Sequence, residues 1–257
     1  MTKVIMEVMS PAWQTLFAAN GLNGFDDLWQ RQMVQVQEPN TDRGGMSYVY
    51  RLELNSEQGP LDFYVKRQQN YNCQYWREPW RVHPVCEREW YNSLRLLREG
   101  IPAIEPVYYG RRRDDNGNLQ AIFVTLGLKD FQPLSIWLKQ DQSTSGQRQQ
   151  VLQAVGAQVR QMHDRGMIHH CLYTNHVFIR QTAEGVACRF IDLEKLRPRW
   201  MAPRGKWRDF ETLYNRGRGW DKQDWRWLLQ GYLHELDWTD ACANLEQKIA
   251  RKFKTKH

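Results

Sequence analysis

The chain of 257 residues is long enough to bury a sizeable core and fits one large domain or two small lobes. Its hydrophobic content of 41% and charged content of 25% are ordinary for a globular protein and exclude intrinsic disorder. The formal net charge of +7 indicates an anionic partner, such as a nucleic acid, a phosphate-rich glycolipid or an acidic membrane surface. A moderate positive charge also serves solubility alone.

The cysteines and the hydropathy pattern indicate in which cellular compartment the protein is expected. Five cysteines have no short paired spacing, so neither a zinc site nor a disulfide framework is predicted, and a reducing cytoplasm fits best. No run of about 18 apolar residues occurs, which predicts a chain that is soluble or peripheral to a membrane and does not span one. Tryptophans such as Trp80 and Trp200 lie among polar residues, and either core packing or exposure on a binding surface would explain them.

Residues 1–36 are predicted to form short helices. Ser10 and Pro11 suit a helix start, because proline is well placed at the first helical position, and Gly21 and Gly24 interrupt the helical pattern. We expect this segment to be an N-terminal helical extension packed on the main body.

Residues 37–126 are predicted to be rich in β-strands. Gly44 and Gly45 precede alternating residues and predict a turn in a β-hairpin, where paired glycines let backbone N–H groups approach a phosphate, although such a pair is more often only a turn. The next predicted strand, residues 61–67, presents Lys66 after an apolar run. Glu89 lies on a predicted helix over 87–99 and either pairs with Lys66 or remains a solvated charge.

The apolar spacing of that helix places Trp90, Leu94 and Leu97 on one face. Beyond residue 127 the pattern becomes helical, and the longest predicted helix covers 147–165 with Val151, Val155, Val159 and Met162 at helical spacing. Strands followed by helices predict an α+β fold with two lobes, a β-rich N-lobe at 37–126 and an α-rich C-lobe at 127–257.

The stretch from Met167 to Ile179, followed by Phe190 to Glu194, carries the functional signal. It predicts a loop that leads into a strand, a turn and a second strand ending at the carboxylate of Asp192. In protein-kinase folds this layout places two metal-binding side chains and one base at a cleft. Gly44-Gly45, Lys66, Glu89, the 169–176 loop and Asp192 follow one another in kinase order, and together they predict phosphoryl transfer.

These residues resemble the lipopolysaccharide core kinase (Kdo/WaaP) family and, within it, the InaA-like branch. The resemblance spans roughly residues 40–235 and is carried by residues 43–47, 65–66, 88–90, 99–102, 162–169, Tyr173 with His176, 191–194 and 208–213. The Tyr173 and His176 pair is specific, because ordinary protein kinases carry Asn where His176 stands. The resemblance implies a bilobal protein-kinase-like fold and a cytoplasmic, ATP- and Mg²⁺-dependent enzyme that phosphorylates a sugar of the lipopolysaccharide inner core or a related glycan.

The resemblance also implies roles for single residues. Lys66, held by Glu89, would bind the nucleotide phosphates beneath the loop of Gly44 and Gly45. Asp192 would chelate magnesium, with His176 as the second metal ligand or as a polar substitute for one. Histidine suits a hard ion such as Mg²⁺ less well than Asn does.

Cys171 departs from the pattern of the transferases in this family, which carry an Asp in a His-Arg-Asp run where this chain reads His169-His170-Cys171. A neutral thiol accepts a hydrogen bond weakly, and a thiolate requires a lowered pKa. His169 or His170 is an alternative base. The candidate catalytic residues are therefore Cys171, His169 and Asp192.

Two functions remain open at this stage. The first is a kinase that acts on the lipopolysaccharide core or a related anionic glycolipid, with peripheral association with the inner membrane as an option. The second is a pseudokinase scaffold or regulator that binds nucleotide without efficient transfer, which the loss of the Asp favours. A nucleic-acid binder is disfavoured, because charge and tryptophans support it without a recognisable motif.

Overall fold

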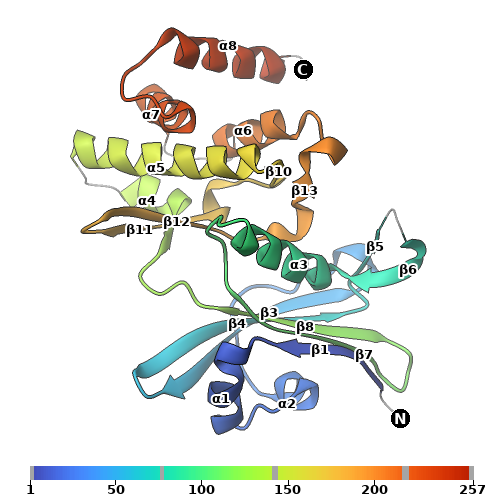
Figure 1. Ribbon diagram of the computed structural model, residues 1–257. Helices are drawn as coiled ribbons and strands as arrows, with labels where there is room; N and C mark the ends of the chain where they lie inside the picture. The colour runs from blue at the N-terminus through green and yellow to red at the C-terminus, as the bar shows by residue number, and fades with distance from the viewer. Residues whose placement is uncertain (1–2, 76–77, 141–143, 216–219, 255–257) are drawn as a thin grey trace. The chain divides into compact units, whose positions relative to one another are not determined.

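The computed structural model describes residues 3–75, 78–140, 144–215 and 220–254. The chain divides into two compact units (Figure 1). Unit 1 comprises Met1–Arg95 and Ile104–Lys129, and unit 2 comprises Leu96–Ala103 and Asp130–His257. Strands dominate unit 1 and helices dominate unit 2, which confirms the predicted α+β class with the β-rich part first.

Unit 1 is built on a six-stranded antiparallel sheet with the strand order β1-β7-β8-β4-β3-β2. Its strands are β1 (Lys3–Met9), β2 (Val34–Gln35), β3 (Met46–Ser56), β4 (Gly59–Gln69), β7 (Pro106–Arg113) and β8 (Leu119–Leu126). Two short helices, α1 (Pro11–Ala19) and α2 (Phe25–Gln30), and a 3₁₀ turn, η1 (Asp42–Gly44), lie between the first strands. Strands β7 and β8 form an antiparallel hairpin within this sheet.

The N-terminal segment differs from the expectation of helices alone. Both predicted helices form, but residues 3–9 form β1, which pairs with β7 at the edge of the sheet. Ile5 and Val8 are exposed, whereas Met6 and Met9 are partly buried, so the strand is covered only in part. A seven-residue strand at the start of a chain has a short period-2 pattern, and only its pairing with β7 fixes it.

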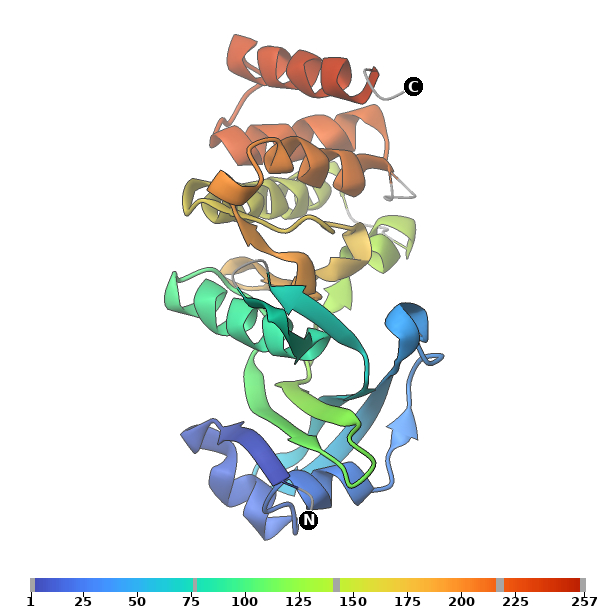
Figure 2. The same cartoon turned by 90° about the vertical axis from the view of Figure 1, so that its right-hand side faces the viewer.

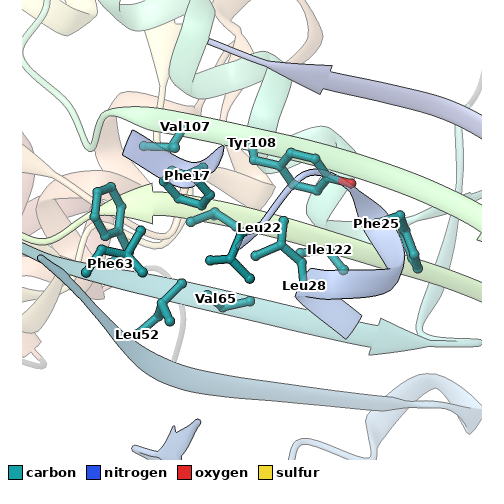
Figure 3. Close-up of a cluster of buried hydrophobic side chains, with 12 residues drawn as sticks. Phe17, Leu22, Phe25, Leu28, Leu52, Phe63, Val65, Val107, Tyr108 and Ile122 are labelled. Carbon is teal, nitrogen blue, oxygen red and sulfur yellow. The ribbon is translucent and has the colours of Figure 1, made fainter. Parts of the chain in front are cut away.

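The first core of unit 1 lies between this sheet and the two N-terminal helices (Figure 3). Phe17 and Leu28 come from the helical segment and are fully buried, and they pack with Leu52, Phe63 and Val65 of β3 and β4. The edge of Phe63 meets Phe17, with ring centroids 5.1 Å apart. The N-terminal segment is therefore part of the core of unit 1.

A second cluster involves α3 (Val85–Arg98), where Cys86 and Trp90 pack with Tyr109 and Phe123. The predicted helix is present, but Leu97 is 38% exposed whereas Leu96 is fully buried. Ser93 is buried too, because its hydroxyl donates to the carbonyl of Glu89 at 2.8 Å. The buried face of α3 therefore includes the polar Ser93 and passes through Leu96, one position before the predicted Leu97.

The hairpin of β5 (Asn72–Tyr75) and β6 (Glu78–Pro84) precedes α3 and is anchored to it by polar contacts. Both ring nitrogens of His83 face carboxylates, with Nδ1 2.9 Å from Glu87 and Nε2 3.1 Å from Glu78. Glu87 also accepts hydrogen bonds from Tyr109 at 2.7 Å and from Arg111 at 2.5 Å. This buried network fixes the start of the helix that carries Glu89.

Unit 2 is mainly helical (Figures 1 and 2). Its helices are α4 (Leu134–Gln140), α5 (Ser145–Asp164), α6 (Gly205–Asn215), α7 (Lys222–Leu233) and α8 (Asp240–Lys254). Its short strands are β9 (Gln132–Pro133), β10 (Met167–Ile168), β11 (Val177–Thr182), β12 (Gly185–Phe190) and β13 (Arg197–Pro198), with 3₁₀ turns η2 (Thr174–His176), η3 (Leu193–Lys195) and η4 (Arg199–Met201). Helix α7 packs on α5, and α8 packs on α6 and α7; Figure 2 shows these C-terminal helices in orange and red.

The helix α5 is the central element of unit 2. Its four predicted apolar positions, Val151, Val155, Val159 and Met162, are all fully buried. It packs closely on α7, because a Cβ at Gly156 would lie 2.0 Å from the carbonyl oxygen of Leu228. The contact requires glycine, since any side chain would separate the two helices.

Within the described residues, no helix is both long and apolar enough to cross a membrane.

Candidate active site

Unit 1 contains the predicted glycine pair, Gly44 and Gly45. Different structural constraints favour glycine at the two positions. Gly44 ends η1 with φ +71°, a left-handed conformation that favours glycine. A Cβ at Gly45 would lie 2.2 Å from the backbone of Asn70, so the two backbones touch at this point. The close approach of Gly45 to Asn70 accounts for that glycine without any phosphate.

Unit 1 also contains the predicted Lys66 and Glu89 pair. Lys66 lies on β4, and its Nζ forms an ion pair with the Oε2 of Glu89 on α3. The Glu89 side chain is 5% exposed and that of Lys66 is 22% exposed. A carboxylate this buried holds the ammonium in a defined position, and the solvated alternative for Glu89 is wrong.

Unit 2 brings together the loop residues and Asp192. The loop runs from β10 through η2 into β11, and the hairpin β11–β12 returns the chain to Asp192. The backbone N–H of Ile191 donates to the carbonyl of His176 at 3.1 Å, which closes the hairpin at the level of the loop. The rings of His169 and His176 are stacked with centroids 6.1 Å apart.

Asp209 on α6 fixes the backbone of this loop. Its carboxylate accepts the N–H of His169 at 2.8 Å and the N–H of His170 at 2.7 Å. The Nε2 of His163 lies 3.2 Å from the same carboxylate, and the hydroxyl of Tyr232 lies 3.0 Å from its Nδ1. Asp209 has no exposed surface, so these contacts replace its lost hydration.

His169 is an interior residue. Its Nε2 lies 3.0 Å from the carbonyl oxygen of Ile191 and must carry the proton, since a carbonyl only accepts. Its Nδ1 is buried and has no hydrogen-bond partner among the described residues. Burial lowers the pKa of His169, which keeps the ring neutral.

Cys171 is 5% exposed, and its carbonyl oxygen accepts hydrogen bonds from the loop itself. The thiol lies beside the ammonium of Lys195 at the end of η3. Partial burial opposes it, but Cys171, Glu194 and Asp192 together raise the pKa of Lys195 above its ordinary value. A positive charge therefore lies next to the position of the missing Asp.

His176 and Asp192 face one another, with Nε2 3.4 Å from the Oδ2 of Asp192. The Nδ1 of His176 lies 2.8 Å from the carbonyl of Cys171 and must be the protonated nitrogen. In a neutral ring, Nε2 then directs a lone pair at a carboxylate, which is unfavourable unless a cation lies between them. Asp192 has φ +57°, a left-handed conformation that Asp adopts more readily than most residues.

The donor set fits one magnesium ion in part. Mg²⁺ is held in proteins by one or two carboxylates together with substrate phosphates, and the Asp192 carboxylate is 36% exposed. Within the described part of the chain, no three His, Cys, Asp or Glu side chains gather into a metal site. Asp192 therefore suits a metal whose other ligands come from a nucleotide and water, with the Nε2 of His176 beside it.

We expect the folded state to be sensitive to acid through His170. Burial lowers the pKa of His170, and Arg197 and Arg208 lower it further against the opposing effect of Asp209. Because the folded pKa lies below the ordinary value of about 6.5, the unfolded chain takes up the proton first, and stability is lost as the pH falls below about 6.5. Urea unfolding at pH 7.5 and at pH 5.5 measures this loss. The variant His170→Asn should lose less stability between these two pH values, and Asn suits the left-handed φ of +67° at this position. An identical pH dependence of the unfolding free energy in both proteins would contradict the assignment to His170.

Sequence reasoning assigned no role to Asp209 or Lys195. Asp209 lies on the buried face of α6 with Phe210 and Leu213. A carboxylate among the apolar residues of a helix face indicates a buried charge with a bonding partner, and this pattern is visible in the sequence. The chain offers no comparable sign for Lys195, because only the fold of η3 turns its side chain toward Cys171.

Comparison with known proteins identifies the family. The lipopolysaccharide kinase (Kdo/WaaP) family matches residues 26–232. The match covers most of the chain, including both glycines and every candidate residue described above. The chain belongs to the lipopolysaccharide kinase (Kdo/WaaP) family.

The chain is also similar to two individual proteins. Protein InaA of Escherichia coli (strain K12) is 28% identical over 211 residues, which cover 81% of this chain and 94% of InaA. A solved structure of WaaP in complex with acyl carrier protein aligns with a TM-score of 0.65 at 20% identity, covering 96% of this chain and 99% of that one. The family match confirms the predicted family, the similarity to InaA agrees with the predicted InaA-like branch, and the similarity to WaaP supports the fold alone.

Proposed function

We propose that the protein transfers the terminal phosphoryl group of ATP to a hydroxyl of a lipopolysaccharide core sugar or a related glycan. The buried ion pair of Lys66 and Glu89 carries this proposal. A lysine held by a carboxylate is the part that phosphoryl-transfer enzymes of this fold use to hold the non-transferred phosphates. Membership in a family of lipopolysaccharide kinases supports ATP as the donor and a core sugar as the acceptor.

In this proposal the residues of unit 2 supply the rest of the machinery. Asp192, with His176 beside it, would hold the magnesium ion, which when bound neutralises charge on the phosphates. Cys171 would lie where the acceptor hydroxyl is oriented. His169 has no exposed surface, so we assign it a positioning role, in which it holds Ile191 next to Asp192.

A pseudokinase is the second candidate, and Cys171 favours it. The thiol is nearly buried, and a neutral thiol accepts a hydrogen bond only weakly. In that case Lys66 and Asp192 would serve nucleotide binding, and the protein would act as a scaffold or regulator. Positioning and charge stabilisation supply most of the rate in phosphoryl transfer, so the absence of the Asp lowers the expected activity without removing it.

Phosphate transfer tests the two candidates. Labelled phosphate should move from magnesium ATP to purified, dephosphorylated core lipopolysaccharide, and Asp192→Asn should lower the rate at least about 10²-fold, since removing one preformed charge at a transition state costs that much. Lys66→Met should have a similar effect. The exposed Lys139 on α4 provides the control Lys139→Met, which should leave the rate unchanged.

The outcomes of this experiment distinguish the kinase from the pseudokinase and test the role of Asp192. Transfer that persists in Asp192→Asn would exclude Asp192 as the metal ligand. Nucleotide binding that depends on Lys66, without transfer to any core acceptor, would support the pseudokinase.

A further inference from the structure

Residues 195–208 form a segment, here called the basic strap, that contains six basic residues and no acidic one. It begins three residues after Asp192 and ends immediately before Asp209, so both of its ends adjoin the candidate site. Within it, Arg197 of β13 pairs with Ile168 of β10, and the N–H of Arg199 donates to the carbonyl of Gly166 at 2.7 Å. The basic strap is therefore fixed beside the loop that leads to Cys171.

Cations from other helices meet the basic strap. Burial lowers the pKa of Lys206, and Arg199, Lys248 of α8 and Arg160 of α5 lower it further. Cations from different parts of unit 2 therefore gather around Lys206, and among them Arg160 is also paired with Asp164, whose carboxylate lies 2.7 Å from its Nε. A solvated charged face would usually mix both signs, whereas a concentration of one sign attracts an anion.

Two tryptophans accompany these charges. Trp200 follows Arg199 and is 66% exposed, although an indole ring is normally covered. The Nζ of Lys206 lies 4.7 Å from the ring centroid of Trp207. An exposed aromatic face among cations suits a ligand that combines apolar C–H surface with negative charge, as a sugar that carries phosphate or carboxylate groups does.

We propose that the basic strap binds the acceptor through its anionic sugar head group. Arg199, Lys206 and Lys248 would hold phosphate or carboxylate substituents, and the ring of Trp200 would pack against a sugar face. This inference deepens the proposed function and rests on it, because it assigns the acceptor to the segment between Asp192 and Asp209.

Binding without ATP tests the inference separately from catalysis. The ligand is a deacylated core oligosaccharide that retains phosphate groups remote from the transfer position, titrated into the full chain by calorimetry. Arg199→Gln/Lys206→Gln should weaken binding about 10-fold or more, as expected for losing charge-assisted hydrogen bonds. Trp200→Ala should weaken it severalfold. Lys139→Gln/Lys222→Gln removes the same charge from exposed positions on α4 and α7 and should leave the affinity within about twofold.

Three comparisons would overturn the inference. The first is unchanged affinity in Arg199→Gln/Lys206→Gln or in the single variants Arg199→Gln and Trp200→Ala, which alter exposed side chains. The second is equal binding of inorganic phosphate or of phosphatidylglycerol vesicles, which would indicate a simple anion or membrane surface. The third is an equal loss of affinity in the control variant Lys139→Gln/Lys222→Gln. Strap-dependent binding without phosphate transfer would leave the inference standing and reject the proposed kinase activity.

Discussion

Cys171→Asp should raise the rate of phosphate transfer about 10²-fold, at the lower end of what a positioned general base contributes. A carboxylate accepts a hydrogen bond from the acceptor hydroxyl, whereas a neutral thiol does so weakly. The substitution places a charge at a position that is 5% exposed, but the Lys195 ammonium beside it offers a partner. The rate of labelled phosphate transfer from magnesium ATP to core lipopolysaccharide measures the effect.

Cys171→Asn is the matched control, because its side chain has the size of Asp but accepts no proton. A rise in Cys171→Asp alone identifies the missing base as the limiting feature of an enzyme. An equal rise in both variants would instead reflect polarity or packing. No transfer in the wild type or in either variant, with nucleotide binding intact, would indicate that the protein works as a scaffold.

Asp209→Asn should destabilise unit 2 by about 3–5 kcal/mol, the cost of breaking a buried charged network by removing one partner. Asn keeps the shape, but one oxygen becomes an NH₂ group that faces a backbone N–H donor or His163. The amide of His169 or that of His170 then loses its acceptor, since the two amides donate to different oxygens of Asp209, at 2.8 and 2.7 Å. Urea unfolding measures the loss of stability, and hydrogen exchange at these two amides locates it.

The control for this prediction is Asp237→Asn, at an exposed position outside the network. It should change the unfolding free energy by less than about 0.5 kcal/mol. The outcome that would reject the role of Asp209 is unchanged protection of the amides of His169 and His170 in Asp209→Asn. We also expect slower transfer in Asp209→Asn, since the loop would no longer hold Cys171 in place.

The sequence by itself determined the class of fold and the order of the candidate site. Alternating residues after Gly45 and helical spacing along Val151, Val155, Val159 and Met162 are local patterns, and β3 and α5 form where these patterns predict them. The family was readable for the same reason, because its motifs are short runs such as those around His176 and Asp192. The match to residues 26–232 confirms it.

The tertiary structure decided which side chains meet. Lys66 and Glu89 lie on different elements, and only the packing of α3 in unit 1 shows that they pair. Asp209 is distant in sequence from the loop that it fixes, and its buried carboxylate is explained by backbone N–H groups that no sequence pattern displays. Strand β1 likewise depends on a partner strand, because a short edge strand is stabilised by its ladder more than by its own residues. Local sequence patterns specify helices and strands. The hydrogen bonds and ion pairs that build the site form between residues of different helices, strands and loops, and only the tertiary structure brings these together.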